Sequence, residues 1–370
     1  MSAYRVLVLG GYGFFGARLV RRLALQDGLH ILVAGRSIDA ANALVASVRP
    51  TSTSSLEGAA VDAMSATFLA QLRELRPSVV VHTAGPFQSQ DYRVAQACIA
   101  AGVHYVDLAD AREFVCGVGE LDHEAKAARV FVVSGASSVP ALSGAVCDSL
   151  ALGLARVDTI DVGISPGNRT ERGLATMRAI LGYCGQPIGP SGDSHRSRGW
   201  IGRWRFTYDA PVGTRLLSPC DVPDLALLPA RYAGKPQVRF GAGLELKFMH
   251  FGMNGMAWLV KAGLMRNWSR HAVLLKRIAD WFQHWGTDAG AMHVSLSGFD
   301  AQGRNVMRSW QLLALHGDGP YVPTLAASAL VRKLAAGEQL PVGAMPCVGV
   351  LSVQDFEREC KGLAITMRTP

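Results

Sequence analysis

The chain has 370 residues, of which 49% are hydrophobic, so it can bury two moderate cores, and we expect two domains. It contains no apolar secretory segment, no run of about 18 apolar residues that could span a bilayer, and no C-x-x-C pair among its seven cysteines. These features argue against a membrane span, a disulfide framework or a metal site and favour a cytoplasmic protein, while the formal net charge of +8 suits an anionic cofactor or substrate.

A glycine-rich segment at residues 10–16 connects the apolar run 6–9 to an amphipathic stretch. A strand, glycines and a helix in this order are the context in which G-x-G-x-x-G predicts a dinucleotide site. The glycines allow a tight turn, close approach to a pyrophosphate and close packing of the helix, whose N-terminus attracts an anion. The alternative is a glycine-rich turn without a ligand. We predict cofactor contacts from Gly11, Tyr12, Gly13, Phe14, Phe15 and Gly16.

The second apolar run, residues 31–34, is followed by Gly35, Arg36 and Ser37. An NAD site usually places Asp or Glu here to bind the ribose hydroxyls. This chain has no acid at that point, and the guanidinium of Arg36 with the hydroxyl of Ser37 suits a 2′-phosphate. A solvated surface arginine is the alternative, and Asp39 works against the preference. We predict NADP(H), bound through Arg36 and Ser37, over NAD(H).

Up to about residue 150, apolar runs alternate with helical patterns, which predicts βαβ units in a parallel sheet. Four further strands are expected at 59–61, 79–81, 105–108 and 130–133, giving six in all, with helices near 66–76, 89–101 and 118–128. Asp62 follows the third strand, where it is predicted to lie near the adenine or, equally, to act as a loop cap.

From about residue 155, glycine, proline and polar residues become dense, and the predicted strands look antiparallel: 157–163, 203–208, 244–251, 292–299 and 304–315. The fold class is therefore α/β, a Rossmann-type doubly wound parallel sheet with a second α+β substrate domain built on a mostly antiparallel sheet. We expect a dinucleotide-binding domain at 1–152 and a substrate domain at 153–318. A C-terminal segment at 319–370, with a helix near 322–336, is expected to return to the first domain.

One long helical segment is expected at 255–285, where four tryptophans occur among Lys and Arg residues. A basic, tryptophan-bearing amphipathic helix can lie on a membrane surface, which makes peripheral membrane contact one interpretation. A lid over an apolar substrate is another. We favour a third, in which the apolar stripe packs on a sheet.

Arginines and aromatic residues alternate between 196 and 208, with basic positions at Arg196, Arg198, Arg203 and Arg205. Such spacing can serve a nucleic-acid surface, but the alternation also fits a strand with one exposed face, which we favour. We therefore expect a small-molecule substrate and no nucleic-acid partner. We also expect a homo-oligomer.

Polar loops follow three successive strands of the first domain, and the carboxyl ends of parallel strands meet at one edge of a sheet. The first of these loops is predicted to contact the cofactor through Ala84, Gly85, Pro86 and Phe87. The other two follow the strands at 105–108 and 130–133.

At these loops, residues 81–87, 104–108 and 135–140 resemble the sequential signatures of the saccharopine dehydrogenase-like NAD(P)-binding family, as do the glycine loop and, more weakly, 319–323 and 343–347. The resemblance implies a dinucleotide domain with an inserted substrate domain and hydride transfer at a C=N or activated C=C bond. It also implies that Pro86 and Phe87 border the nicotinamide. Many members carry Thr-Gly-Glu where this chain has residues 109–111, Ala-Asp-Ala, so no role of that glutamate is transferred.

The catalytic candidates lie in the strand at 105–108 and in the last two loops: Tyr105, Asp107, Asp110, Arg112 and Ser138. Such a reaction needs a proton, for which the Tyr and Asp side chains are candidates, and Arg112 can hold a carboxylate by a bidentate contact. The alternatives are strand packing for Tyr105, a helix cap for Asp107 and a loop ion pair between Asp110 and Arg112. The resemblance places Asp107 and Ser138 on the substrate side of the cleft.

Two other enzyme classes are excluded by missing motifs. No lysine has a tyrosine four residues before it, as extended short-chain reductases require, and there is no G-x-S-x-G motif of a hydrolase. The sequence therefore predicts an NADP(H)-dependent oxidoreductase, with a non-catalytic NADP(H)-sensing protein as the alternative.

Overall fold

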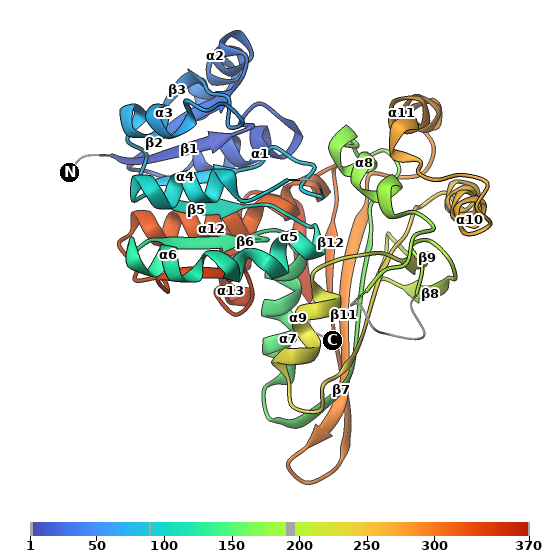
Figure 1. Ribbon diagram of the computed structural model, residues 1–370. Helices are drawn as coiled ribbons and strands as arrows, with labels where there is room; N and C mark the ends of the chain where they lie inside the picture. Colours follow the sequence, from blue (N-terminus) through green and yellow to red (C-terminus); the bar gives the residue numbers. More distant parts are fainter. Residues whose placement is uncertain (1–2, 89, 190–196, 369–370) are drawn as a thin grey trace. The chain divides into compact units, whose positions relative to one another are not determined.

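The computed structural model describes residues 3–88, 90–189 and 197–368 (Figure 1). The chain divides into two compact units: unit 1 consists of Met1–Leu142 and Tyr321–Glu359, and unit 2 of Ser143–Pro320 and Cys360–Pro370. The C-terminal segment is thus shared. Helices α12 (Val322–Ala335) and α13 (Val353–Glu359) belong to unit 1, whereas the last strand, β14 (Ile365–Arg368), belongs to unit 2.

Unit 1 is built on a parallel seven-stranded sheet in the order β13-β6-β5-β4-β1-β2-β3. This confirms the predicted Rossmann-type fold, and β13 adds a seventh strand to the six that were predicted. The strand order reverses between β1 and β4, the position at which such sheets bind ligands. The strands are β1 (Tyr4–Leu9), β2 (Leu29–Gly35), β3 (Ser55–Ala60), β4 (Val79–His82), β5 (His104–Asp107), β6 (Phe131–Ser134) and β13 (Gly343–Pro346).

Helices cover both faces of this sheet, so its central strands are apolar on both sides (Figure 1). On one face α1 packs on α12 and α12 on α13, while on the other α3 packs on α4. The remaining helices of this unit complete the layers. Besides α12 and α13 they are α1 (Phe14–Leu23), α2 (Ile38–Val48), α3 (Phe68–Leu75), α4 (Arg93–Ala101), α5 (Arg112–Gly117) and α6 (Asp122–Ala127).

Unit 2 is built on a second seven-stranded sheet in the order β14-β12-β11-β7-β10-β9-β8. Its pairs are antiparallel except β7 with β10, which confirms the mostly antiparallel second sheet. The elements are β7 (Leu154–Ser165), β8 (Trp204–Thr207), β9 (Thr214–Pro219), β10 (Gln237–Ala242), β11 (Gly290–Asp300) and β12 (Asn305–Ala314), with helices α7 (Ser143–Ala151), α8 (Leu174–Tyr183), α9 (Asp224–Arg231), α10 (Lys247–Lys261) and α11 (Ala272–Trp281).

The predicted strand at 244–251 is wrong, because α10 begins at Lys247. Apolar and polar residues alternate only up to Phe248, which mimics a strand. From there the buried positions are His250, Asn254, Ala257 and Val260, the spacing of one helix face.

The single helix predicted at 255–285 is also wrong. Gly263, with a φ of 76°, follows α10 and ends it, and a 3-10 turn precedes α11. The favoured packing of an apolar stripe on a sheet is wrong as well, since Trp258, Trp281 and Trp285 are exposed. None of the helices in the described ranges is both long enough and apolar enough to cross a membrane.

The predicted strand near 203–208 is confirmed as β8. Arg205 and Thr207 are exposed, while Trp204 and Phe206 are half-buried, as expected for one exposed face. Arg196, which the prediction included in the basic cluster, lies outside the described residues.

Candidate cofactor site

The turn between β1 and α1 requires glycine at two positions. Gly10 adopts a φ of 72°, which favours glycine, and its carbonyl oxygen accepts a hydrogen bond from the Gly13 amide at 2.8 Å. A Cβ atom on Gly16 would overlap that same carbonyl group. The backbone therefore curls tightly at the carboxyl end of β1, as the glycine spacing predicts.

The N-terminus of α1 is left open by this turn. Gly13 is its N-cap and makes no side-chain cap, and the first turn, which includes Phe14 and Phe15, holds no acidic residue. The amides of that turn and the positive end of the helix dipole suit a phosphate group. Since a backbone curl that only glycine allows leads into an uncapped helix, the residues present fit the pyrophosphate of a dinucleotide.

Thr83 fixes the glycine turn to the neighbouring strand. Its hydroxyl donates to the carbonyl oxygens of Leu9 at 2.8 Å and Gly10 at 3.1 Å. Thr83 directly follows β4, which pairs with β1, so this contact lies where the strand order reverses. Thr83 was not among the site residues predicted from the sequence. The available signal was a hydroxyl residue at the end of a predicted central strand.

The end of β2 presents an exposed Arg36. Next to it, Ser37 caps α2: its Oγ accepts a hydrogen bond from the Ala40 amide at 3.2 Å. The Ser37 amide donates to the Tyr12 hydroxyl at 2.9 Å, so Tyr12 links the glycine turn to the end of β2. The Ser37 hydroxyl keeps its own proton available for donation. The structure thus brings Tyr12, Arg36 and Ser37 together.

Asp62 follows β3 on the surface. Its Oδ1 accepts a hydrogen bond from the Met64 amide at 3.0 Å, which is the geometry of a loop cap, one of the two roles predicted for Asp62.

The loop after β4 folds back on unit 1. The ring of Phe87 is buried, with its centroid 5.0 Å from the ring of His82 and 5.4 Å from that of Phe114. Gln90 donates through its side-chain amide to the carbonyl oxygens of Ala84 at 2.8 Å and Pro86 at 3.0 Å. The segment from Ala84 through Gly85 to Phe87 is therefore held in one conformation beside the glycine turn.

Asp107 joins the ends of β5 and β6. Its fully buried carboxylate accepts hydrogen bonds from the Gly135 amide at 2.8 Å, the Ala109 amide at 2.9 Å and the Ser134 hydroxyl at 3.0 Å. Burial raises the pKa of Asp107 to about 6, against the opposing effect of these bonds. These partners lie in the loops after β5 and β6, and the N-cap of the next helix, α5, is Ala111, so Asp107 links two loops and does not cap a helix.

Tyr105 lies in the core of unit 1, its hydroxyl 3.2 Å from Nδ1 of His82. Burial raises the pKa of Tyr105 well above its usual value and lowers the pKa of His82 to about 4, so both groups are neutral at pH 7. This burial matches the alternative of strand packing. Ser138 is also buried, at the start of the turn Ser138–Leu142.

Asp110 and Arg112 are the predicted catalytic residues that stay partly accessible. The Gln88 side-chain amide donates to Oδ1 of Asp110 at 3.2 Å, which links the loops after β4 and β5. Burial raises the pKa of Asp110. Arg112 begins α5, two residues further along the chain.

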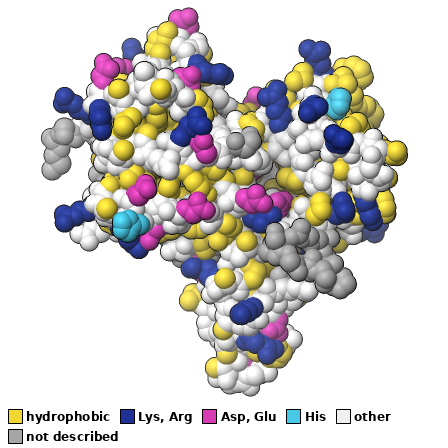
Figure 2. Space-filling view, viewed as in Figure 1, with side chains coloured by type: hydrophobic (Ala, Val, Ile, Leu, Met, Phe, Trp, Pro, Cys, Tyr) yellow, Lys and Arg dark blue, Asp and Glu magenta, His cyan; other side chains and the backbone are white. Residues whose placement is uncertain are grey.

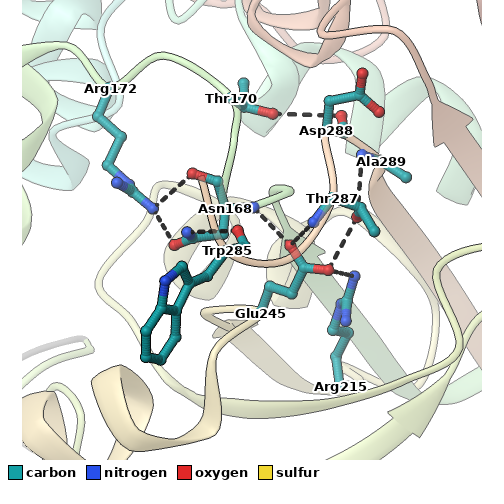
Figure 3. A network of polar contacts seen from close by, with 9 residues as sticks. All are labelled: Asn168, Thr170, Arg172, Arg215, Glu245, Trp285, Thr287, Asp288 and Ala289. Carbon is teal, nitrogen blue, oxygen red and sulfur yellow. Dashed lines mark hydrogen bonds and ion pairs between the residues drawn. The ribbon is translucent and has the colours of Figure 1, made fainter. Parts of the chain in front are cut away.

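Unit 2 contains a separate polar network that was not predicted from the sequence (Figure 3). Glu245 accepts hydrogen bonds from the Asn168 amide at 2.7 Å and from the amide and hydroxyl of Thr287, both at 2.9 Å, and it pairs with Arg215 at 3.1 Å. Its members lie far apart in the chain, so no local pattern indicates them.

These features define unit 1 as an NAD(P)-binding domain of the Rossmann type. Residues 6–133 match the family model described as Saccharopine dehydrogenase NADP binding domain. The match confirms the resemblance inferred from the loop motifs. It contains the glycine turn, Arg36 and the loops that follow β4 and β5.

No curated protein sequence matches the chain. Among solved structures, saccharopine dehydrogenase (L-Glu forming) from Saccharomyces cerevisiae aligns over 100% of both chains at 12% identity with a TM-score of 0.68. Homospermidine synthase from Legionella pneumophila in complex with NAD aligns over 99% of this chain and 91% of its own at 12% identity, with a TM-score of 0.55. Amine dehydrogenase from Mycobacterium smegmatis aligns over 94% and 96% at 12% identity, with a TM-score of 0.50. At such identities the likeness shows a shared fold.

Proposed function

We propose that the protein is an NADP(H)-dependent oxidoreductase that transfers a hydride to or from a C=N or activated C=C bond. The observation that carries the proposal is the uncapped N-terminus of α1 behind a backbone curl that only glycine allows, within a domain of the saccharopine dehydrogenase NADP-binding family. When bound, the dinucleotide supplies or accepts the hydride. The protein binds and orients the cofactor and the substrate, and it supplies or removes the proton.

Arg36 supports a preference for NADP(H). Its guanidinium is exposed at the carboxyl end of β2, where an NAD site places an acidic residue. A guanidinium binds phosphate oxygens through two parallel hydrogen bonds, whereas ribose hydroxyls need an acceptor. The Ser37 hydroxyl adds a donor next to it.

For the proton we assign Asp110. It is partly accessible, its pKa is raised by burial, and Gln88 orients one of its oxygens. Arg112 is assigned to a carboxylate or another anionic group of the substrate. Tyr105, Asp107 and Ser138 are then positioning residues: Asp107 holds the ends of β5 and β6 in register, so that the loop bearing Asp110 is fixed.

The test is oxidation of NADPH in the presence of imines, amino-acid and keto-acid pairs, and enoyl compounds, with wild type and Asp110→Asn compared. We expect kcat to fall by roughly 100-fold or more in Asp110→Asn, with the Kd for NADPH unchanged. Asp91→Asn is the control, since Asp91 is exposed in the loop after β4 and pairs only with Arg93 among the described residues. Unchanged turnover in Asp110→Asn would contradict the assignment of Asp110 as the group that transfers the proton. NADPH binding without turnover of any compound supports the non-catalytic sensing protein instead.

A further inference from the structure

Segment 247–285 of unit 2 exposes an unusual amount of apolar surface. Ten of the sixteen large hydrophobic side chains that are exposed among the described residues lie within it, including Leu264 and Trp281, which are 76% and 75% exposed. We call this segment, from α10 to the end of α11 and on to Trp285, the α10–α11 surface. An exposed apolar patch of this kind marks an interaction site.

The helices of this surface bury mainly small or polar residues and expose most of their large apolar ones. In α11 the buried residues are Ala272 and Ala279, while Leu274, Ile278 and Trp281 are exposed. In α10 the buried face includes His250 and Asn254, which bond to the Ser218 hydroxyl at 3.0 Å, and the exposed residues include Phe248, Phe251 and Trp258. This is the reverse of a helix that packs its apolar stripe on a core.

The charges of the same surface favour a negatively charged partner. Segment 247–285 contains six Lys and Arg residues and a single acidic residue, Asp280, which pairs with Lys276 at 2.8 Å. Figure 2 shows Lys and Arg side chains among hydrophobic ones on the part of the molecule that carries α10 and α11. Tryptophan, large apolar side chains and an excess of cations together are the composition of helices that lie in the headgroup region of a bilayer.

A basic pocket adjoins the start of α10. It has a volume of about 500 Å³, and its lining includes Arg203, Arg205, Arg215, Lys247 and the ring of Phe251. The Arg203 guanidinium lies 5.2 Å from the centre of that ring. Cations around a concave site next to exposed aromatic rings suit a phosphate headgroup whose acyl chains meet the apolar residues.

Both ends of the α10–α11 surface are fixed to the sheet of unit 2. Glu245 precedes α10 and bonds to Thr287, which follows the surface in the chain (Figure 3). Asn168 donates through its side-chain amide to the carbonyl oxygens of Phe282 at 2.6 Å and Trp285 at 2.9 Å. The rings of Phe248, Phe282 and Trp285 pack edge to face and connect the two helices. These contacts therefore fix the backbone that carries the exposed apolar side chains.

We propose that the α10–α11 surface binds the protein peripherally to anionic phospholipid bilayers, with the basic pocket taking up a headgroup phosphate. The occupant is an anionic membrane because cations and interfacial aromatic residues occur on the same surface. The proposal is independent of turnover and of the identity of the cofactor.

The test is co-sedimentation of the full chain with vesicles of phosphatidylcholine alone and with about one third phosphatidylglycerol. We expect binding to the anionic vesicles that weakens at about tenfold higher salt, and little binding to phosphatidylcholine. The apolar variant Leu264→Ser with Trp281→Ser and the charge variant Arg266→Glu, Arg270→Glu and Arg277→Glu are each expected to weaken binding by roughly tenfold or more.

Two matched controls separate this surface from general effects. Leu152→Ser removes an exposed apolar residue elsewhere in unit 2, and Arg21→Glu, Arg49→Glu and Arg73→Glu make the same change of net charge on unit 1. Both controls are expected to bind vesicles as wild type does, and thermal unfolding verifies that every variant is folded. Equal binding by the test and control variants, or no vesicle binding by wild type, overturns the proposal. If light scattering shows a dimer that the apolar variant abolishes, without vesicle binding, the surface contacts a second copy of the chain and the proposal is wrong.

Discussion

Glu245 is the centre of the polar network of unit 2 that contains Asn168, Thr287 and Arg215, and its side chain is 8% exposed beside an Arg215 that is 9% exposed (Figure 3). Burial acts to raise the pKa of Glu245, but the hydrogen bonds from Asn168 and Thr287 together with Arg215 hold it below its usual value. A carboxylate whose pKa is lowered by folding stabilises the fold at neutral pH and loses that effect in acid.

Glu245→Gln is therefore expected to lower the free energy of unfolding by about 3 kcal/mol at pH 7, because Arg215 is left buried without its counter-charge. Because the pKa of Glu245 is lowered by folding, the loss of stability in Glu245→Gln is full above the pKa of a Glu in the unfolded chain, about 4.3. The loss becomes smaller as the pH falls through the pKa of Glu245 in the folded protein. Urea unfolding at several pH values measures it. Asp158→Asn is the control, since its pair with Arg156 is more exposed, and a change under about 1 kcal/mol is expected there. A similar small change in Glu245→Gln would show that the network contributes little.

Residues of the candidate site were predictable to the extent that their signal is local. The glycine turn and Arg36 were assigned because strand, turn and helix follow each other directly in the chain. Thr83 was missed because its role depends on β4 pairing with β1, and Glu245 because its partner Asn168 is 77 residues away. Burial could not be predicted from the sequence either: Tyr105 is a plausible proton donor until the structure places it in the core.

At the scale of the element, the turn between β1 and α1 sets the cofactor site. A Cβ on Gly16 would meet the Gly10 carbonyl group and the Thr83 hydroxyl, neither of which can move without opening the turn. Gly16→Ala is expected to lower stability by roughly 1–3 kcal/mol and to weaken NADPH binding strongly. Thermal unfolding and fluorescence titration measure the two effects. Gly119→Ala, where nothing lies within 4 Å of the added atom, is expected to change neither. Full NADPH affinity in Gly16→Ala contradicts this account of the turn.

The elements of unit 1 were more predictable than those of unit 2. Central strands of a parallel sheet are buried on both faces, so they stand out as short apolar runs. Strand β13 was missed because four residues containing Gly343 and Pro346 carry no such signal. In unit 2, the apolar residues of α10 and α11 recur at the spacing of a buried helix face, although they are exposed. Periodicity alone does not show which face of a helix is covered.

At the scale of the molecule, two units of nearly equal size share the C-terminal segment, and the cofactor features all lie in unit 1. The strand order and the open end of α1 fit a dinucleotide, and the exposed Arg36 is the basis of the proposed preference for one that carries a 2′-phosphate. The proposed substrate and proton roles both depend on a bound cofactor, so recognition of the dinucleotide comes first.

Isothermal titration calorimetry of the intact protein with NADPH and NADH tests this most directly, with wild type and Arg36→Ala compared. We expect NADPH to bind at least about tenfold more tightly than NADH, since charge-assisted hydrogen bonds to the extra phosphate contribute roughly 1.5–3 kcal/mol. Arg36→Ala is expected to raise the Kd for NADPH by roughly 10- to 100-fold and to leave that for NADH nearly unchanged. Tighter binding of NADH by wild type contradicts the assignment of Arg36, and binding of neither dinucleotide contradicts the account as a whole.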